Sequence, residues 1–259
     1  SVASQWGLEK QHRTKINYLA EAYFNQTKAD LLIATTANKS AGKILTYHGA
    51  KKIPQYDYDK VLYWVINPDR FLFSVINNNL RYTGLKKLAR GLMRPVPDII
   101  NFFKLNRPKS SKIKIDAIKI EDIDYSFDDL WMRKRSEKKC IFACRDAETL
   151  YWNFSYVNQK GQVRVLVHQT NRLLGYCVVI GETVKKMGLR RLKIADLFVE
   201  GDDELIISNL ISAAYEYGFK EDYDVLEWVG MPKRLRKIAS KHNHFTRNLP
   251  IWPLYYKVK

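Results

Sequence analysis

The sequence has few of the residues that define specialised structural classes. Three cysteines, Cys140, Cys144 and Cys177, are too few for a disulfide scaffold, and no nearby histidine completes the first two as a zinc site. Twelve glycines and eight prolines in 259 residues exclude a collagenous or linker-rich chain. No apolar run approaches the roughly 18–20 residues that span a bilayer. We therefore expect a globular, cytoplasmic protein with reduced thiols, no metal and no membrane span.

Acidic residues are scarce relative to basic ones. The chain has 27 Asp and Glu against 44 Lys and Arg, which gives a formal net charge of +17. Such an excess favours an anionic partner, whether nucleic acid, acidic lipid or a phosphorylated ligand, although solvated lysine-rich surfaces also produce it. The basic clusters at 133–135, 185–186, 190–191 and 233–237 belong to no recognised RNA-binding motif. Nucleic acid is therefore the least favoured partner.

The N-terminus lacks both an initiating Met and the features of a signal peptide. Residues 1–6 have neither a basic flank nor an apolar stretch, so we expect a piece of a longer chain. Hydrophobic residues make up 46% of the sequence and aromatic residues 13%, which is enough for a sizeable core. Apolar patterning predicts strands over 30–36, 60–66, 113–120, 162–169, 173–183, 191–199, 225–230 and 251–258, and helices over 3–24, 39–48, 125–138, 145–156, 203–218 and 232–242.

Part of this pattern occurs twice. Residues 30–48 match residues 224–242 at six of 19 positions when shifted by 194, and Leu62-Tyr63 matches Leu254-Tyr255 at a shift of 192. Each match consists of a strand, a helix and a further strand. Chance similarity between two such units is the alternative, but the repeated order favours an internal duplication.

Two groups of residues resemble a known family. Asn38, Ala41 and Gly49 have the spacing Asn-x2-Ala-x7-Gly between two strands, which resembles the end of a GNAT-superfamily acyltransferase domain. The segments 145–152 and 194–197 are similar to segments of tandem-GNAT proteins, which also resemble Fem-type peptidyl transferases.

The resemblance implies a fold and a division of the chain. Residues 1–66 would be the second half of a first GNAT-like domain, truncated at its N-terminus, and residues 67–112 a helical basic linker. Residues 113–259 would be a complete GNAT-like domain, of class α/β, with a mixed, mostly antiparallel sheet and helices on both faces. The truncated half would expose a strand edge at 30–36, which we expect either to dock on the second domain or to mediate self-association.

It also implies an activity, namely acyl transfer from acetyl-CoA or another acyl-CoA to an amine of a small molecule or peptide. Asn38 and Ala41 would contact the cofactor, as would Leu197, Phe198 and Val199 of the cofactor strand; capping of the helix at 39–48 is an equal explanation for Asn38. Asp196 and Glu227 are the candidate general bases, because burial in apolar strands raises a carboxyl pKa toward the useful range. A buried, hydrogen-bonded structural acid is the alternative for either one.

One segment departs from the family pattern. Residues 200–204 read Glu-Gly-Asp-Asp-Glu where relatives place backbone donors for a pyrophosphate. Four carboxylates there would repel phosphate and would serve well as helix caps, so we expect weak coenzyme A binding by the second domain. Two further hypotheses stay open, a degenerate GNAT scaffold without catalysis and a protein that binds an anionic polymer.

Overall fold

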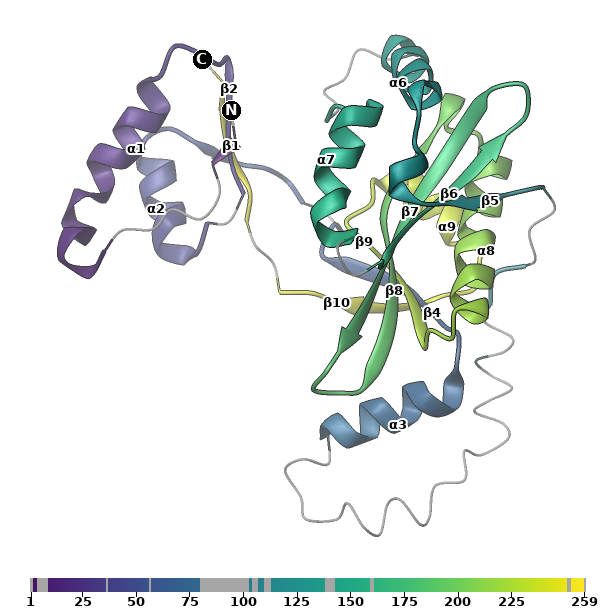
Figure 1. Cartoon of the computed structure of the whole chain (residues 1–259). Coiled ribbons are helices and arrows are strands. Elements are labelled where there is room, and N and C mark those ends of the chain that lie inside the picture. The colour runs from purple at the N-terminus through teal and green to yellow at the C-terminus, as the bar shows by residue number, and fades with distance from the viewer. Residues whose placement is uncertain are drawn as a thin grey trace. The chain divides into compact units, whose positions relative to one another are not determined.

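The computed structural model describes residues 2–3, 9–35, 37–55, 57–79, 103, 107–109, 113–137, 143–158, 161–250 and 253–258. The chain forms two compact units, a smaller one of residues 1–59 with 248–259 and a larger one of residues 60–247 (Figure 1). Of the expected linker, helix α3 (Pro68–Asn79) and a few later residues are described, and Cys140 lies outside the described residues. None of the described helices combines the length and the hydropathy needed to cross a membrane.

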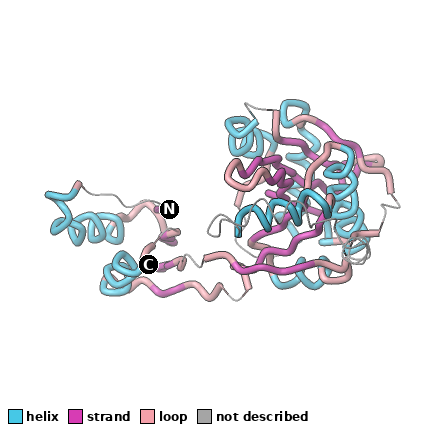
Figure 2. The backbone as a smooth tube through the Cα atoms, turned by 90° about the horizontal axis from the view of Figure 1, so that it is seen from below, coloured by secondary structure: helices cyan, strands magenta, loops and turns pink. Residues whose placement is uncertain are grey.

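The smaller unit is a four-stranded sheet with helices, and both ends of the chain belong to it (Figure 2). Its strands lie in the order β1 (Val2–Ala3), β2 (Leu31–Ala34), β11 (Tyr255–Val258) and β3 (Lys51–Lys52). β1 is parallel to β2, whereas β11 is antiparallel to both β2 and β3. A 3-10 turn (Lys10–Lys15), α1 (Ile16–Asn25) and α2 (Lys39–Tyr47) complete the unit.

Helix α2 begins and ends where its sequence predicts. Asn38 caps the N-terminus, because its side-chain Oδ1 accepts a hydrogen bond of 2.9 Å from the backbone N–H of Ala41. Gly49 follows the last turn at φ +81°, a conformation that glycine adopts at little cost. Leu45 of this helix packs with Phe24 and Leu32 in the core of the smaller unit.

The larger unit is built on a seven-stranded sheet. The strands on one side of this sheet are antiparallel to one another and include the expected hairpin at residues 162–183. Strand β9 (Val225–Val229) is parallel to β8 (Leu189–Val199) and antiparallel to β4 (Lys60–Val65). In spatial order the strands are β10 (Phe245–Asn248), β4 (Lys60–Val65), β9 (Val225–Val229), β8 (Leu189–Val199), β7 (Leu173–Val184), β6 (Val163–Gln169) and β5 (Asp116–Ile118).

Helices cover both faces of this sheet (Figure 1). On one face, α6 (Tyr125–Glu137) and α7 (Ala147–Asn158) share a core with β6 and β7. On the other face, α8 (Glu204–Lys220) and α9 (Lys233–Ala239) pack on β8 and β9. Short 3-10 turns precede α6 (Ile120–Asp122) and α8 (Glu200–Asp202). The expected mixed, mostly antiparallel sheet with helices on both faces is confirmed.

Two strands lie in a different unit from the one that the sequence favoured. β4 belongs to the larger sheet beside β9, and β11 belongs to the smaller sheet, so the units do not coincide with boundaries at 66 and 113. Burial explains the exchange. Four of the six β4 residues are buried, as a central strand requires, whereas the Tyr-Tyr-Lys-Val sequence of β11 is only half buried.

Three smaller differences concern element ends. Val2–Ala3 is a strand, although a helix was expected from residue 3, and β10 was not expected at all. Each is short, so neither carries enough apolar residues for a periodic signal. Pro232 is the N-cap of α9 rather than a residue of its first turn, and the helix ends earlier than expected, at Ala239.

The two sheets repeat one arrangement of neighbours. In the smaller unit β1 is parallel to β2 and β11 is antiparallel to it; in the larger unit β8 is parallel to β9 and β4 is antiparallel to it. Ile33 pairs with Tyr256, and Glu227, 194 positions after Ile33, pairs with Tyr63. The tyrosines in these two pairs differ by 193 positions, one more than the shift of 192 at which the sequences of their strands match.

Removing β11 should unfold the smaller unit alone, because β11 supplies the antiparallel partner of β2 and of β3. In a chain that ends at Leu249, we expect the amides of β2 to lose their protection from hydrogen exchange. The amides of β9, whose partners β4 and β8 remain, should exchange as in the full chain. Unchanged protection of residues 31–34 would contradict the assignment of β11 to this unit.

Candidate functional site

The main irregularity of the larger sheet lies between its two parallel strands. β8 and β9 pair only from Arg191–Val225 to Ile194–Trp228, and over their described residues no pair follows. On its other edge β8 has a β-bulge, because Val178 of β7 faces Asp196 whereas Val179 faces Ile194, which leaves Ala195 as an extra residue. A bulge bends a strand and increases its twist. The far half of β8 therefore diverges from β9 while it stays paired with β7.

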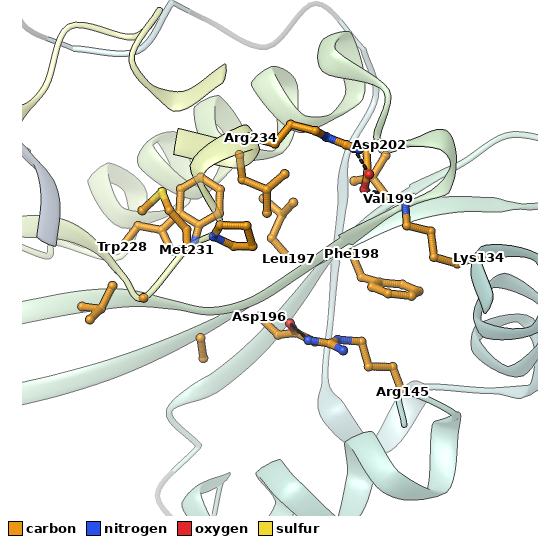
Figure 3. A pocket seen from close by; sticks show the side chains of 15 residues that line it. Lys134, Arg145, Asp196, Leu197, Phe198, Val199, Asp202, Trp228, Met231 and Arg234 are labelled. Carbon is orange, nitrogen blue, oxygen red and sulfur yellow. Dashed lines mark hydrogen bonds and ion pairs between the residues drawn. The ribbon is translucent and has the colours of Figure 1, made fainter. Parts of the chain in front are cut away.

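A cavity of about 430 Å³ opens where the strands diverge (Figure 3). Most of its walls are apolar, and they come from β8, from β9 and from the turn that leads into α9. Five charged side chains complete the lining and come from α6, from the residues before α7, from β8, from the turn after β8 and from α9. The apolar residues are Ala195, Leu197, Phe198, Val199, Trp228, Val229, Met231 and Leu235, and the charged ones are Lys134, Arg145, Asp196, Asp202 and Arg234.

Asp196 stands directly after the bulge and is held from two sides. Arg145 donates two hydrogen bonds to its carboxylate, from Nε at 2.8 Å and from Nη2 at 3.1 Å, and the hydroxyl of Tyr176 donates a third at 3.1 Å. The Arg145 guanidinium also lies 5.2 Å from the centre of the Phe198 ring. Burial alone would lower the pKa of Arg145, but its hydrogen bonds and charge attraction to Asp196 raise it above its usual value. Burial raises the pKa of Tyr176 well above its ordinary range, so this phenol is a stable hydrogen donor.

Glu227 does not line this cavity. It lies on β9 between Leu226 and Trp228, whose side chains belong to the core on the α8 face, and successive side chains of a strand point to opposite faces. Arg247 donates hydrogen bonds of 3.0 and 3.1 Å to its two carboxylate oxygens, and Arg191 lies 3.5 Å from one of them. The structure therefore separates the two carboxylates that the sequence grouped as candidate bases.

The expected cofactor residues fall into two sets. Leu197, Phe198 and Val199 line the cavity at the end of β8. Asn38 lines a separate cavity of about 650 Å³ in the smaller unit, together with Lys39, Gly42, Lys43 and Tyr255 among others. Ala41 is not among its lining residues; its backbone N–H donates to the Asn38 cap. The capping explanation for Asn38 is thus confirmed.

Each carboxylate of residues 200–204 has a defined partner within the chain. Asp203 caps α8, with hydrogen bonds of 2.8 and 3.0 Å from the N–H groups of Leu205 and Ile206. The other three form ion pairs: Glu200 with Arg133 and Arg172, Asp202 with Lys134 and Arg234, and Glu204 with Lys241. The predicted capping role is confirmed for Asp203, and the local negative charge is offset by neighbouring cations.

Sequence reasoning missed most of the charged lining. Arg145 was part of the family resemblance but had no assigned role, and Lys134 and Arg234 were interpreted as members of basic surface clusters. No local signal marks these three residues, because helices distant in the sequence bring them to β8. Within the described residues, no group of three or more His, Cys, Asp or Glu side chains is arranged to hold a metal ion.

Comparison with known proteins finds solved structures with a similar fold but no related sequence. No protein-family model matches the chain, and no curated protein matches its sequence. Solved structures do match: a GCN5-related N-acetyltransferase from Anabaena variabilis (TM-score 0.58, 8% identity, 99% of this chain and 55% of that one) and a probable N-acyltransferase from Enterococcus faecalis (0.55, 8%, 99% and 54%). The N-myristoyltransferase of Saccharomyces cerevisiae with bound myristoyl-CoA also matches (0.50, 14%, 96% and 56%).

These similarities identify the GNAT-superfamily fold that the sequence resemblance implied. The chain spans about half the length of each of these three structures. At 8–14% identity the likeness concerns the arrangement of the backbone, and the chemistry of the cavity has to be argued from its own residues.

Replacing Arg145 with Ala should destabilise the larger unit by about 1–3 kcal/mol, because the mostly buried Asp196 carboxylate loses two charged hydrogen bonds. Urea unfolding of the two proteins measures the difference. Arg172→Ala is a matched control, since it breaks a more exposed pair with Glu200, which keeps Arg133 as a partner. We expect its effect to stay below about 0.5 kcal/mol. Equal free energies of unfolding for Arg145→Ala and the parent chain would show that the Arg145–Asp196 pair does not stabilise the larger unit.

Proposed function

We propose that the chain functions in GNAT-type N-acyl transfer, in which an acyl group passes from acyl-CoA to an amine of a small molecule or peptide. The carrying observation is the divergence of β8 and β9, which opens an apolar cavity with a carboxylate, Asp196, at its wall. The fold similarity to acetyltransferases and N-acyltransferases supports the same conclusion.

The cavity meets the needs of acyl transfer in two ways. An acyl-CoA donor supplies a thioester carbonyl, which an amine attacks only in its unprotonated form. The Asp196 carboxylate is the group in the cavity suited to accept the amine's proton, and Arg145 and Tyr176 fix its position. Beyond Ile194 no further residue pair joins β8 to β9 over their described residues, and an extended, amide-bearing ligand would lie between the two strands there.

We assign Glu227 a structural part, because Arg247 and Arg191 surround its carboxylate outside the cavity. Asn38 and Ala41 belong to the strand–helix unit of the smaller sheet, which has the same strand neighbours as the larger one. That correspondence supports a tandem arrangement of two GNAT-like units derived by duplication.

The residues present fit only part of an acyl-CoA molecule. The apolar walls of the cavity fit the acyl group and its amide-bearing arm, whereas the N–H groups at the start of α8 are already bonded to Asp203. This mismatch supports a second candidate function, a GNAT scaffold that binds an acyl or peptide group without catalysis. Turnover decides between the two.

Asp196→Asn should lower the rate of acyl transfer at least 100-fold, since a general base contributes about 10²–10⁴ in rate and an amide accepts no proton. Release of free thiol from acetyl-CoA, followed with a panel of lysine peptides and polyamines, measures the rate. Asp116 lies on β5, an edge strand of the same sheet, and does not line the cavity. Asp116→Asn is therefore the matched control and should leave the rate unchanged. Full activity of Asp196→Asn would show that Asp196 is not the general base. Absence of turnover in the parent chain would favour a GNAT scaffold without catalysis.

A further inference from the structure

The turn between β8 and α8 brings one carboxylate to the cavity wall. Gly201 and Asp202 both have positive φ, +63° and +52°, a conformation that is uncommon for any residue other than glycine. Asp202 lines the cavity, with Phe198 between it and Asp196 (Figure 3). Asp is one of the few residues besides glycine that adopt this conformation with some frequency, so the turn directs the Asp202 carboxylate to the cavity wall.

Two cations from distant parts of the chain contact this carboxylate. Lys134 of α6 is 3% exposed, and its Nζ lies 2.5 Å from Oδ1 of Asp202 and 3.1 Å from a carboxylate oxygen of Glu137. Arg234 of α9 forms an ion pair with the other oxygen, Oδ2, of Asp202. A buried ammonium is costly unless it is paired, so this cluster of Lys134, Asp202 and Arg234 depends on its central anion.

The same cluster, without its carboxylate, has the composition of a phosphate site. A lysine and an arginine beside the N-terminus of a 17-residue helix attract an anion through charge, hydrogen bonds and the helix dipole. Here the chain's own carboxylates use these donors. Asp203 accepts from the first N–H groups of α8, Glu137 accepts a 2.6 Å hydrogen bond from the N–H of Gly201, and Asp202 occupies the two cations.

We propose that Asp202 is a specificity residue that takes the place of a ligand phosphate, so that the wall formed by Lys134 and Arg234 binds no phosphate group and the cavity receives only the uncharged acyl or apolar part of its ligand. This proposal rests on the proposed function for its substrate class, but the exclusion of phosphate is independent of it. The remaining walls fit such a group, because Leu197, Trp228 and Met231 line the cavity beside the cluster. A ligand with a phosphate would have to displace a carboxylate that is already bound to a buried lysine.

Asp202→Asn tests the proposal as a gain of binding. Asn keeps the shape of the side chain and tolerates positive φ, but leaves Lys134 and Arg234 with less negative charge. We expect calorimetric titration with inorganic pyrophosphate, and with coenzyme A, to give an affinity at least tenfold higher than that of the parent chain. The gain should weaken as salt is raised. Asp202→Gly, which suits the backbone of the turn better, is a second variant in case the first does not fold.

Glu204→Gln is the matched control, because it removes one negative charge from the start of α8 without touching Lys134 or Arg234. Its pyrophosphate affinity should equal that of the parent chain. The proposal is overturned if the parent chain binds pyrophosphate as tightly as Asp202→Asn, if neither folded Asp202 variant gains affinity, or if Glu204→Gln gains as much. A thioester without phosphate, S-acetyl-N-acetylcysteamine, separates this question from the proposed function. Failure of that donor to acetylate any amine would count against acyl transfer and leave the pyrophosphate result intact.

Discussion

The divergence of two parallel strands after four residue pairs determines most of what the larger unit can do. Up to Ile194 and Trp228, β8 and β9 form one continuous sheet with a buried core on the α8 face. Past the bulge at Ala195, β8 stays paired with β7 but has no further residue pair with β9 over their described residues, and the cavity opens between the two strands there. The candidate site is therefore a property of backbone pairing first and of side chains second.

The charged side chains around this cavity form local ion pairs and do not make up one continuous positive surface. Arg145 lies with Asp196, Lys134 and Arg234 with Asp202, and Arg133 and Arg172 with Glu200. Two of the four basic clusters that raised an anionic-polymer hypothesis thus contribute cations to these pairs, and another, Arg190-Arg191, is bonded to Asp222, Glu182 and Glu227. A net charge of +17 consequently says less about partners than its size implies.

Local features of the sequence were sufficient for the fold class and for most elements. The Asn38 cap and the Gly49 terminus depend on interactions within a few residues, and the strand predicted at 225–230 is marked by its own apolar residues, so each was predictable. The assignment of β4 and β11 to sheets was not, because both read as apolar strands and only their burial in the finished fold distinguishes them. For the site, Asp196 and Leu197–Val199 were found through their strand. Lys134 and Arg234 lie on helices and Arg145 lies just before one, and no local pattern encodes how these segments pack against β8.

The exchange of strands between the sheets has a consequence for the order in which the chain folds. Every partner within the larger unit lies inside residues 60–247, but Leu32 of the smaller unit pairs with Lys257, 225 positions later. Pairing of such distant residues adds the entropy of closing a long loop, and it waits for synthesis to reach the C-terminal strand. β2 emerges early and keeps an open edge until β11 arrives, a state in which strands join other chains. Prior folding of the larger unit shortens the effective loop, which makes it a scaffold for completing the smaller sheet.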